Sequence, residues 1–165
     1  MTNRLLAAIA MLVIGLSACK DPKTADAQAM PKQDSTVNPK TTSMHNLISI
    51  VEIPVTDFPR AVTFYQNVLG LAIEEMEMDG VKMGVLPNDE GTVNVVLAKG
   101  NDYKPASGGA VLYLNAGKDL QPTLDKVGKN GGQVIVPKTQ ISPEMGYFAL
   151  FIDTEGNKLG LHSAN

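Results

Sequence analysis

The stretch LISIVEIPV (residues 47–55), followed directly by TDFPRAVTFYQNVLG (residues 56–70), decides the fold. The first segment is rich in β-branched residues and predicts a strand. Asp57 is suited to cap a helix, and Pro59 falls in the first helical turn, where its missing N–H costs nothing. Gly70 is placed to end that helix. Between them, apolar residues recur at helical spacing: Ala61, Phe64, Tyr65 and Val68.

The same order of elements runs twice between residues 44 and 165. After the first helix, turn signals divide the chain into three short predicted strands: 71–78, 81–86 and 92–98. The second half repeats the pattern. It has a predicted strand at residues 110–114 and a helix at residues 119–129, which Asn130-Gly131-Gly132 ends. Three more predicted strands follow, at residues 133–136, 146–153 and 158–162. The two helix-ending glycines, Gly70 and Gly131, occupy corresponding places in the two halves.

Residues 44–165 therefore predict an α+β fold of two βαβββ modules. A sheet with a single helix leaves its other face bare, so neither module should be stable alone. We expect the two modules to pack together as a curled mixed sheet around a cleft. Residues 137–145, between Pro137 and Met145, are interpreted as a loop over the mouth of that cleft.

The N-terminal region predicts a targeting signal and a tether. Residues 1–4 are short and positive, and residues 5–16 are apolar, a run too short for a membrane span and suited to a secretory signal. The run ends in Leu16-Ser17-Ala18-Cys19, which resembles the lipobox of bacterial lipoproteins. The alternative is a buried N-terminal helix with an incidental free cysteine. Residues 20–43 are polar and proline-containing, so they predict a solvated spacer.

The lipobox resemblance implies three parts and a location. Residues 1–18 would be the signal peptide, residues 19–43 the anchor and tether, and residues 44–165 the folded domain. Acyl chains on Cys19 would hold the protein stably at a membrane. Lys20 at the second mature position favours the periplasmic face of the outer membrane over the inner membrane.

Composition excludes several function classes. The chain has 14 Lys and Arg against 17 Asp and Glu, and residues 44–165 carry nine against fourteen, a net charge of −5. With this acidic balance, no Trp and 5% aromatic residues, we expect no nucleic-acid partner. The single cysteine excludes an internal disulfide and a cysteine-based zinc site.

The motifs of both halves resemble those of the vicinal oxygen chelate superfamily, which includes glyoxalase I, extradiol dioxygenases and bleomycin-resistance proteins. The matching residues are these: Asp57-x6-Phe64-Tyr65-x3-Leu69-Gly70-Leu71, Asn130-Gly131-Gly132, and Phe151-x-Asp153-x2-Gly156-Asn157. The resemblance implies the glyoxalase-like fold over the whole domain. It leaves function open, because the superfamily contains lyases, isomerases, oxygenases and metal-free binders.

The metal-ligand positions that the resemblance implies have largely lost their donors. Enzymatic members hold a divalent metal with side chains on strands of both halves, and the corresponding residues are Ile50, Asn94, Gly109 and Gly160. Neither Ile nor Gly has a side-chain donor, whereas divalent ions need oxygen or imidazole ligands. We therefore expect no metal and no other cofactor, and we take these four positions as candidate ligand contacts.

Strand alternation points to a different polar pair. Glu52 shares the face of Ile50, and His162 shares that of Gly160, so a carboxylate and an imidazole could face one cavity as general acid and base. A buried Glu52 would need a partner, and His162 is the natural candidate. The alternatives are a purely structural ion pair or hydrogen bond that closes one end of the sheet, and a two-ligand metal site.

Three functions fit these features. The first is metal-independent binding of a small organic ligand in the cell envelope, with Met83 either an adaptable pocket wall or ordinary core. The second is a glyoxalase-class lyase or isomerase that uses Glu52 and His162, with or without a divalent metal. The third is a structural envelope protein. The bleomycin-resistance-like resemblance also makes a homodimer possible.

Overall fold

The structure is a computed structural model that describes residues 46–165. The expected signal peptide, the lipidation site Cys19 and the tether lie outside the described residues. Within residues 46–165, no helix is long and apolar enough to cross a membrane.

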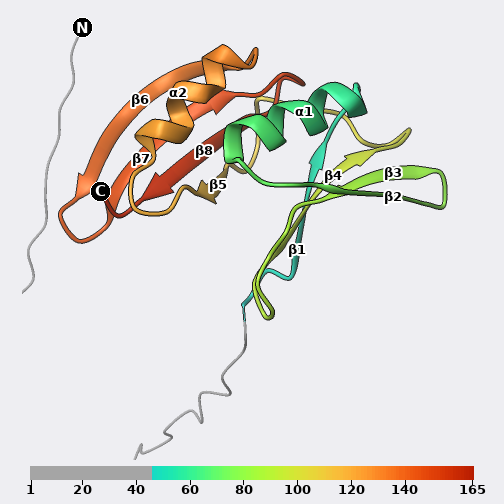
Figure 1. The fold of residues 1–165 in the computed structure, drawn as a ribbon, viewed down its shortest axis with the longest axis horizontal. Coiled ribbons are helices and arrows are strands. Elements are labelled where there is room, and N and C mark those ends of the chain that lie inside the picture. Colours follow the sequence, from blue (N-terminus) through green and yellow to red (C-terminus); the bar gives the residue numbers. More distant parts are fainter. Residues whose placement is uncertain (1–45) are drawn as a thin grey trace, which may run out of the picture. The chain divides into compact units, whose positions relative to one another are not determined.

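The first module has the predicted order of elements. Its elements are β1 (Ile50–Pro54), α1 (Phe58–Leu69), β2 (Glu74–Met78), β3 (Val81–Val85) and β4 (Asn94–Lys99). They form a four-stranded sheet, sheet A, in the order β1-β4-β3-β2, in which β1 and β4 are parallel (Figure 1). The side chain of Asp57 accepts a hydrogen bond from the backbone N–H of Arg60 at 3.2 Å, and Gly70 has a left-handed φ of 69°. The predicted start and end of the helix are thus correct.

The second module repeats the topology of the first. Its elements are β5 (Leu112–Asn115), α2 (Gln121–Lys129), β6 (Gln133–Ser142), β7 (Gly146–Ile152) and β8 (Lys158–Ser163). Sheet B has the order β5-β8-β7-β6, with β5 and β8 parallel. The prediction of an α+β fold from two βαβββ modules is therefore confirmed. The two sheets remain separate and are not closed into a barrel.

The prediction of a loop over residues 137–145 is wrong for residues 137–142, whereas residues 143–145 do form a turn between two strands. Strand β6 continues through Pro137 to Ser142 and pairs with β7 in four stretches separated by three register shifts. Because β6 is an edge strand, Pro137 can lack an N–H without losing a bond inside the sheet. Lys138 of β6 also forms an ion pair with Asp119, in the segment before α2, with 2.7 Å between Nζ and Oδ1.

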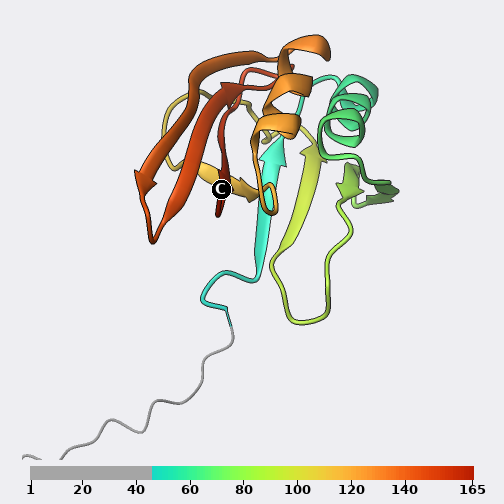
Figure 2. The same cartoon turned by 60° about the vertical axis from the view of Figure 1, so that its left-hand side comes forward.

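One hydrophobic core joins the two modules. It contains side chains from α1, α2 and the helix-bearing faces of both sheets, and the two helices lie side by side in Figures 1 and 2. Phe64 of α1 lies 6.3 Å, centroid to centroid, from Phe151 of β7. Gly132, after α2, approaches Phe64 so closely that a Cβ there would lie 3.0 Å from its ring. The first helix therefore packs on the second module as well as on its own sheet.

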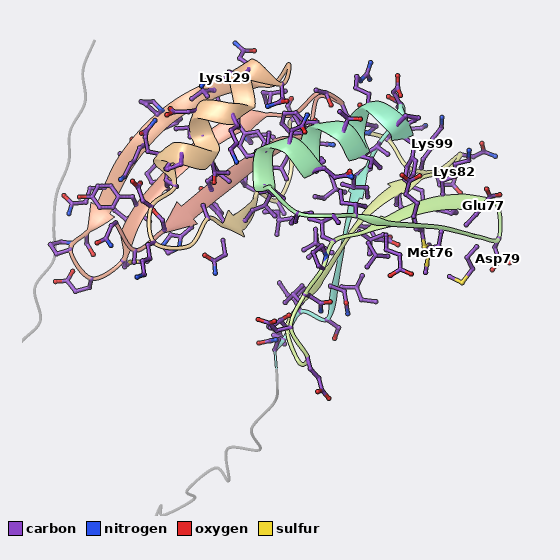
Figure 3. The ribbon with its side chains drawn as sticks, viewed as in Figure 1. Met76, Glu77, Asp79, Lys82, Lys99 and Lys129 are labelled. Atoms are coloured by element: carbon purple, nitrogen blue, oxygen red, sulfur yellow. The ribbon has the colours of Figure 1, made fainter. Side chains whose placement is uncertain are left out.

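The opposite face of each sheet carries no helix and stays partly exposed. On sheet A this face includes Met76, which is 47% exposed. Figure 3 shows Met76 on the β2–β3 hairpin, on the other side from Lys82 and Lys99. Residue alternation along the strands defines these two open faces, which we call the sheet-A face and the sheet-B face.

Candidate functional site

A buried polar network built on Asp153 joins the two modules. Its carboxylate accepts a hydrogen bond from the Tyr65 hydroxyl at 2.7 Å and another from the Asn157 amide at 2.9 Å. The backbone N–H groups of Glu155 and Asn157 donate to its other oxygen at 2.9 and 2.8 Å. Asn157 also donates to the carbonyl oxygen of Pro54 in β1. Burial raises the pKa of Tyr65, and the neighbouring Asp153 raises it further, so this phenol remains a donor.

Glu155 forms a second link between the modules, at the start of α1. One carboxylate oxygen accepts hydrogen bonds from the backbone N–H groups of Thr56 and Asp57, both at 2.9 Å, and from the Thr56 hydroxyl at 2.8 Å. The other accepts from the Arg60 guanidinium at 2.9 Å. The side chain of Glu155 is fully buried. The motif residues after Phe151 therefore hold the modules together, which is a structural role.

Three of the predicted ligand contacts lie on the sheet-A face. Ile50 and Asn94 are paired neighbours on β1 and β4, and Met83 lies on β3. Ile50 is 60% exposed, whereas Asn94 and Met83 are half-buried. Each alternates with residues that face α1, such as Gly84, where a Cβ would touch Phe58. The pairing of β1, β3 and β4 therefore brings these three residues to one face of the sheet.

The remaining two contacts belong to the second module. Gly109 precedes β5, has a φ of 97° and has no neighbouring atom where a Cβ would be. Gly160, in β8, lies directly under the ring of Tyr113, and a Cβ at residue 160 would overlap that ring. Tyr113 is the strand partner of Gly160 on β5.

These positions do not fit the family's metal. Of the four positions that correspond to metal ligands in the family, only Asn94 has a side-chain atom that could bind a metal. At Gly160, the space that a ligating side chain would occupy is filled by the ring of Tyr113. Residues 46–165 contain no group of three or more His, Cys, Asp or Glu side chains that could hold a metal ion.

Glu52 is exposed, contrary to the expectation of a buried carboxylate. It accepts a hydrogen bond from the Tyr103 hydroxyl at 2.9 Å, and this bond raises the pKa of Tyr103. The residue lines a hollow of about 380 Å³ between β1 and the segment leading into β5, which we call the junction hollow. Its walls are mainly apolar, including Val51, Leu112 and Leu159.

His162 lies elsewhere and has a different partner. Its Nε2 is 2.7 Å from the carbonyl oxygen of Met145, and it lines a separate hollow of about 410 Å³ beside Tyr113 and Asn115. No hydrogen bond or ion pair joins His162 to Glu52 in the described part of the chain. The expected pairing of these two residues within one chain is therefore wrong. Alternation assigned each residue to the correct face, but the two faces do not enclose one cavity.

Sequence reasoning missed Tyr113 and Phe148. Tyr113 and Phe148 share the sheet-B face, with ring centroids 6.4 Å apart at 66°. The available signal was Gly160 between two leucines in a strand, because a glycine there marks close approach by another group.

Comparison with known proteins agrees with this architecture. Residues 47–161 match the sequence profile of the Glyoxalase/Bleomycin resistance protein/Dioxygenase superfamily. A glyoxylase-like domain-containing protein from Didymella fabae is 34% identical over 124 residues, which cover 69% of this chain and 91% of that protein.

Solved structures show the same fold at low sequence identity. A mutant of glyoxalase I from Zea mays has a TM-score of 0.57 at 19% identity. The alignment covers 70% of this chain and 45% of the maize chain, so this chain spans less than half the length of that enzyme. TnmS3, an antibiotic binding protein from Streptomyces sp. CB03234, has a TM-score of 0.54 at 19% identity, covering 73% and 97% of the two chains.

Proposed function

The chain belongs to the glyoxalase/bleomycin resistance protein/dioxygenase superfamily, and from this premise we propose that it binds a small organic ligand without a metal. The observation that carries the proposal is the replacement of metal donors by apolar or aromatic surface. Ile50 is exposed where a ligating side chain would be, and Tyr113 covers Gly160. An antibiotic binding protein shares the fold, which supports binding as a use of this scaffold.

The enzymatic alternative has weaker support. A lyase or isomerase reaction through Glu52 and His162 needs both groups at one substrate, but they line separate hollows and have other partners. Two copies of the chain would be needed to supply both groups. Exposed apolar residues on the open faces, such as Ile50 and Met78, support a homodimer. Sedimentation velocity would measure this self-association.

In a thermal-shift screen, at least one compound is expected to bind the purified full-length chain and raise its melting temperature. A ligand at one hundred times its Kd contributes about 2.7 kcal/mol, or roughly 10 °C for a domain of this size. The screen should contain thiol adducts, aldehydes and antibiotics that act on the envelope. Protein purified without chelators should contain no stoichiometric metal, and added chelator should leave the melting temperature unchanged. Stoichiometric nickel, zinc, iron or manganese would contradict metal-independent binding.

We also propose that the protein is an envelope lipoprotein anchored through Cys19, with the outer membrane favoured. The support is the apolar run that ends in Ser17-Ala18-Cys19. In a Gram-negative host, the chain should incorporate labelled palmitate and sediment with membranes. Cys19→Ser should abolish both, whereas Ser17→Ala should leave both intact. Equal labelling of Cys19→Ser would exclude this anchor.

A further inference from the structure

The ring of Tyr113 packs directly against the backbone of Gly160. Three ring atoms of Tyr113 occupy the space where a Cβ at residue 160 would be, so only glycine permits this contact. Gly160 is buried, while Tyr113 is 46% exposed. One side of the ring is therefore packed on the sheet and the other remains open. An exposed aromatic face of this kind is a stacking surface for another flat ring.

Phe148 supports this surface from the side. Its ring lies 6.4 Å from the Tyr113 ring at 66°, an edge-to-face arrangement that is favourable for aromatic pairs. Phe148 is half-buried and is the strand partner of His162. The two aromatic rings thus hold each other in place on the sheet-B face.

Polar atoms line the hollow beside the Tyr113 ring. The Nε2 of His162 lies 2.7 Å from the Met145 carbonyl oxygen, which can only accept, so Nε2 carries the hydrogen. In the neutral ring, Nδ1 is then an acceptor, and no described residue donates to it. Asn115 also lines this hollow, and its Oδ1 accepts from the Gly117 N–H at 2.9 Å, which leaves its amide N–H groups as donors.

We infer that Tyr113, Gly160 and His162 form a shelf that binds a flat aromatic or conjugated ring bearing a hydroxyl or N–H donor at its edge. The ring of the ligand stacks on Tyr113, and its edge donor bonds to Nδ1 of His162. This inference rests on the proposed ligand binding and specifies the class of ligand. The position that would hold a metal ligand in the family becomes, through Gly160, the support of an aromatic surface.

The test compares 2-naphthol with 2-decalol, which has the same carbon skeleton and hydroxyl group but no flat ring. Calorimetric titration of the full-length chain should show at least tenfold tighter binding of 2-naphthol. Tyr113→Phe should bind 2-naphthol within twofold of the parent, because the ring remains. Tyr113→Leu should bind it at least tenfold more weakly. 2-Methoxynaphthalene, which lacks the donor, should bind the parent more weakly than 2-naphthol does. His162→Leu, which has no acceptor at this position, should bind the two compounds with equal affinity.

Two further variants separate loss of the shelf from loss of the fold. Gly160→Ala should expel the ring and weaken 2-naphthol binding tenfold. The double variant Tyr113→Ala with Gly160→Ala removes the clash between the ring and the new Cβ. It should fold, and it should bind 2-naphthol as weakly as Gly160→Ala does. Tyr103→Leu is the matched control, because Tyr103 also packs beside a glycine, Gly100, but lines no part of this shelf. It should leave 2-naphthol binding unchanged.

The proposed shelf would be excluded if Tyr113→Leu bound 2-naphthol as tightly as the parent. It would also be excluded if the parent bound 2-naphthol and 2-decalol with equal affinity. If Tyr113→Leu only dissociates a dimer, the sheet-B face is a contact between copies, and the inference is wrong. The proposed function fails separately, when no compound in the thermal screen stabilises the parent. A screening hit that still stabilises Tyr113→Leu would keep ligand binding and exclude this shelf as its site.

Discussion

Asp153→Ala is expected to lower the free energy of unfolding by about 4 kcal/mol. The substitution strands two buried side-chain donors, the Tyr65 hydroxyl and the Asn157 amide, and two backbone N–H groups. Each stranded buried donor costs about 1–3 kcal/mol, and the effects are not additive. Because domains are stable by only about 5–15 kcal/mol, this change removes a large part of the total.

Urea denaturation followed by circular dichroism measures this loss, with two comparison variants. Tyr65→Phe removes a single bond of the network and should cost about 1–2 kcal/mol. Asp125→Ala removes an exposed carboxylate on α2 that bonds only Gln121 among the described residues, so its effect should stay within about 0.5 kcal/mol. A loss below about 1 kcal/mol for Asp153→Ala would show that the network does not join the modules.

The order of elements could be predicted from the sequence because its signals are local. Asp57, Pro59 and Gly70 act within a few residues, and the structure confirms the helix that they delimit. The repetition of the pattern in the second half then required two modules of one topology. The failure at Pro137 has a long-range cause, because the strand continues there through its pairing with β7 and its contact with Asp119.

The candidate site was only partly predictable, for a related reason. A period of two assigns a strand residue to a face, and it placed Ile50 with Glu52 and Gly160 with His162 correctly. It does not say what covers that face. The second module packs on α1, through Phe64 and Tyr65, and leaves both open faces uncovered, so Glu52 is exposed. No local pattern contains that information.

Glu155→Gln is expected to cost about 2–3 kcal/mol at neutral pH, because hydrogen bonds to a charged group contribute about 1.5–3 kcal/mol each. Burial would raise the pKa of Glu155, but the bonds from Arg60, Asp57 and Thr56 outweigh it and lower the pKa from 4.5 to about 2. Glutamine keeps the shape and one acceptor oxygen, but it loses the charge and the ion pair with Arg60.

The same bonds predict acid sensitivity, with a definite sign. A carboxylate whose pKa is lower in the folded chain stabilises the fold above its unfolded pKa, and this stability is lost as pH falls through the folded pKa. The contribution of Glu155 should therefore be complete above about pH 4.5 and vanish towards pH 2. The unfolding free energies of the parent and Glu155→Gln, measured in urea at several pH values, should converge over that interval. Glu77→Gln, an exposed substitution on β2, is the control and should change the unfolding free energy little, because Glu77 makes no hydrogen bond or ion pair within residues 46–165. A constant difference between the parent and Glu155→Gln from pH 7 to pH 2 would mean that shape, and not charge, makes Glu155 the link between the modules.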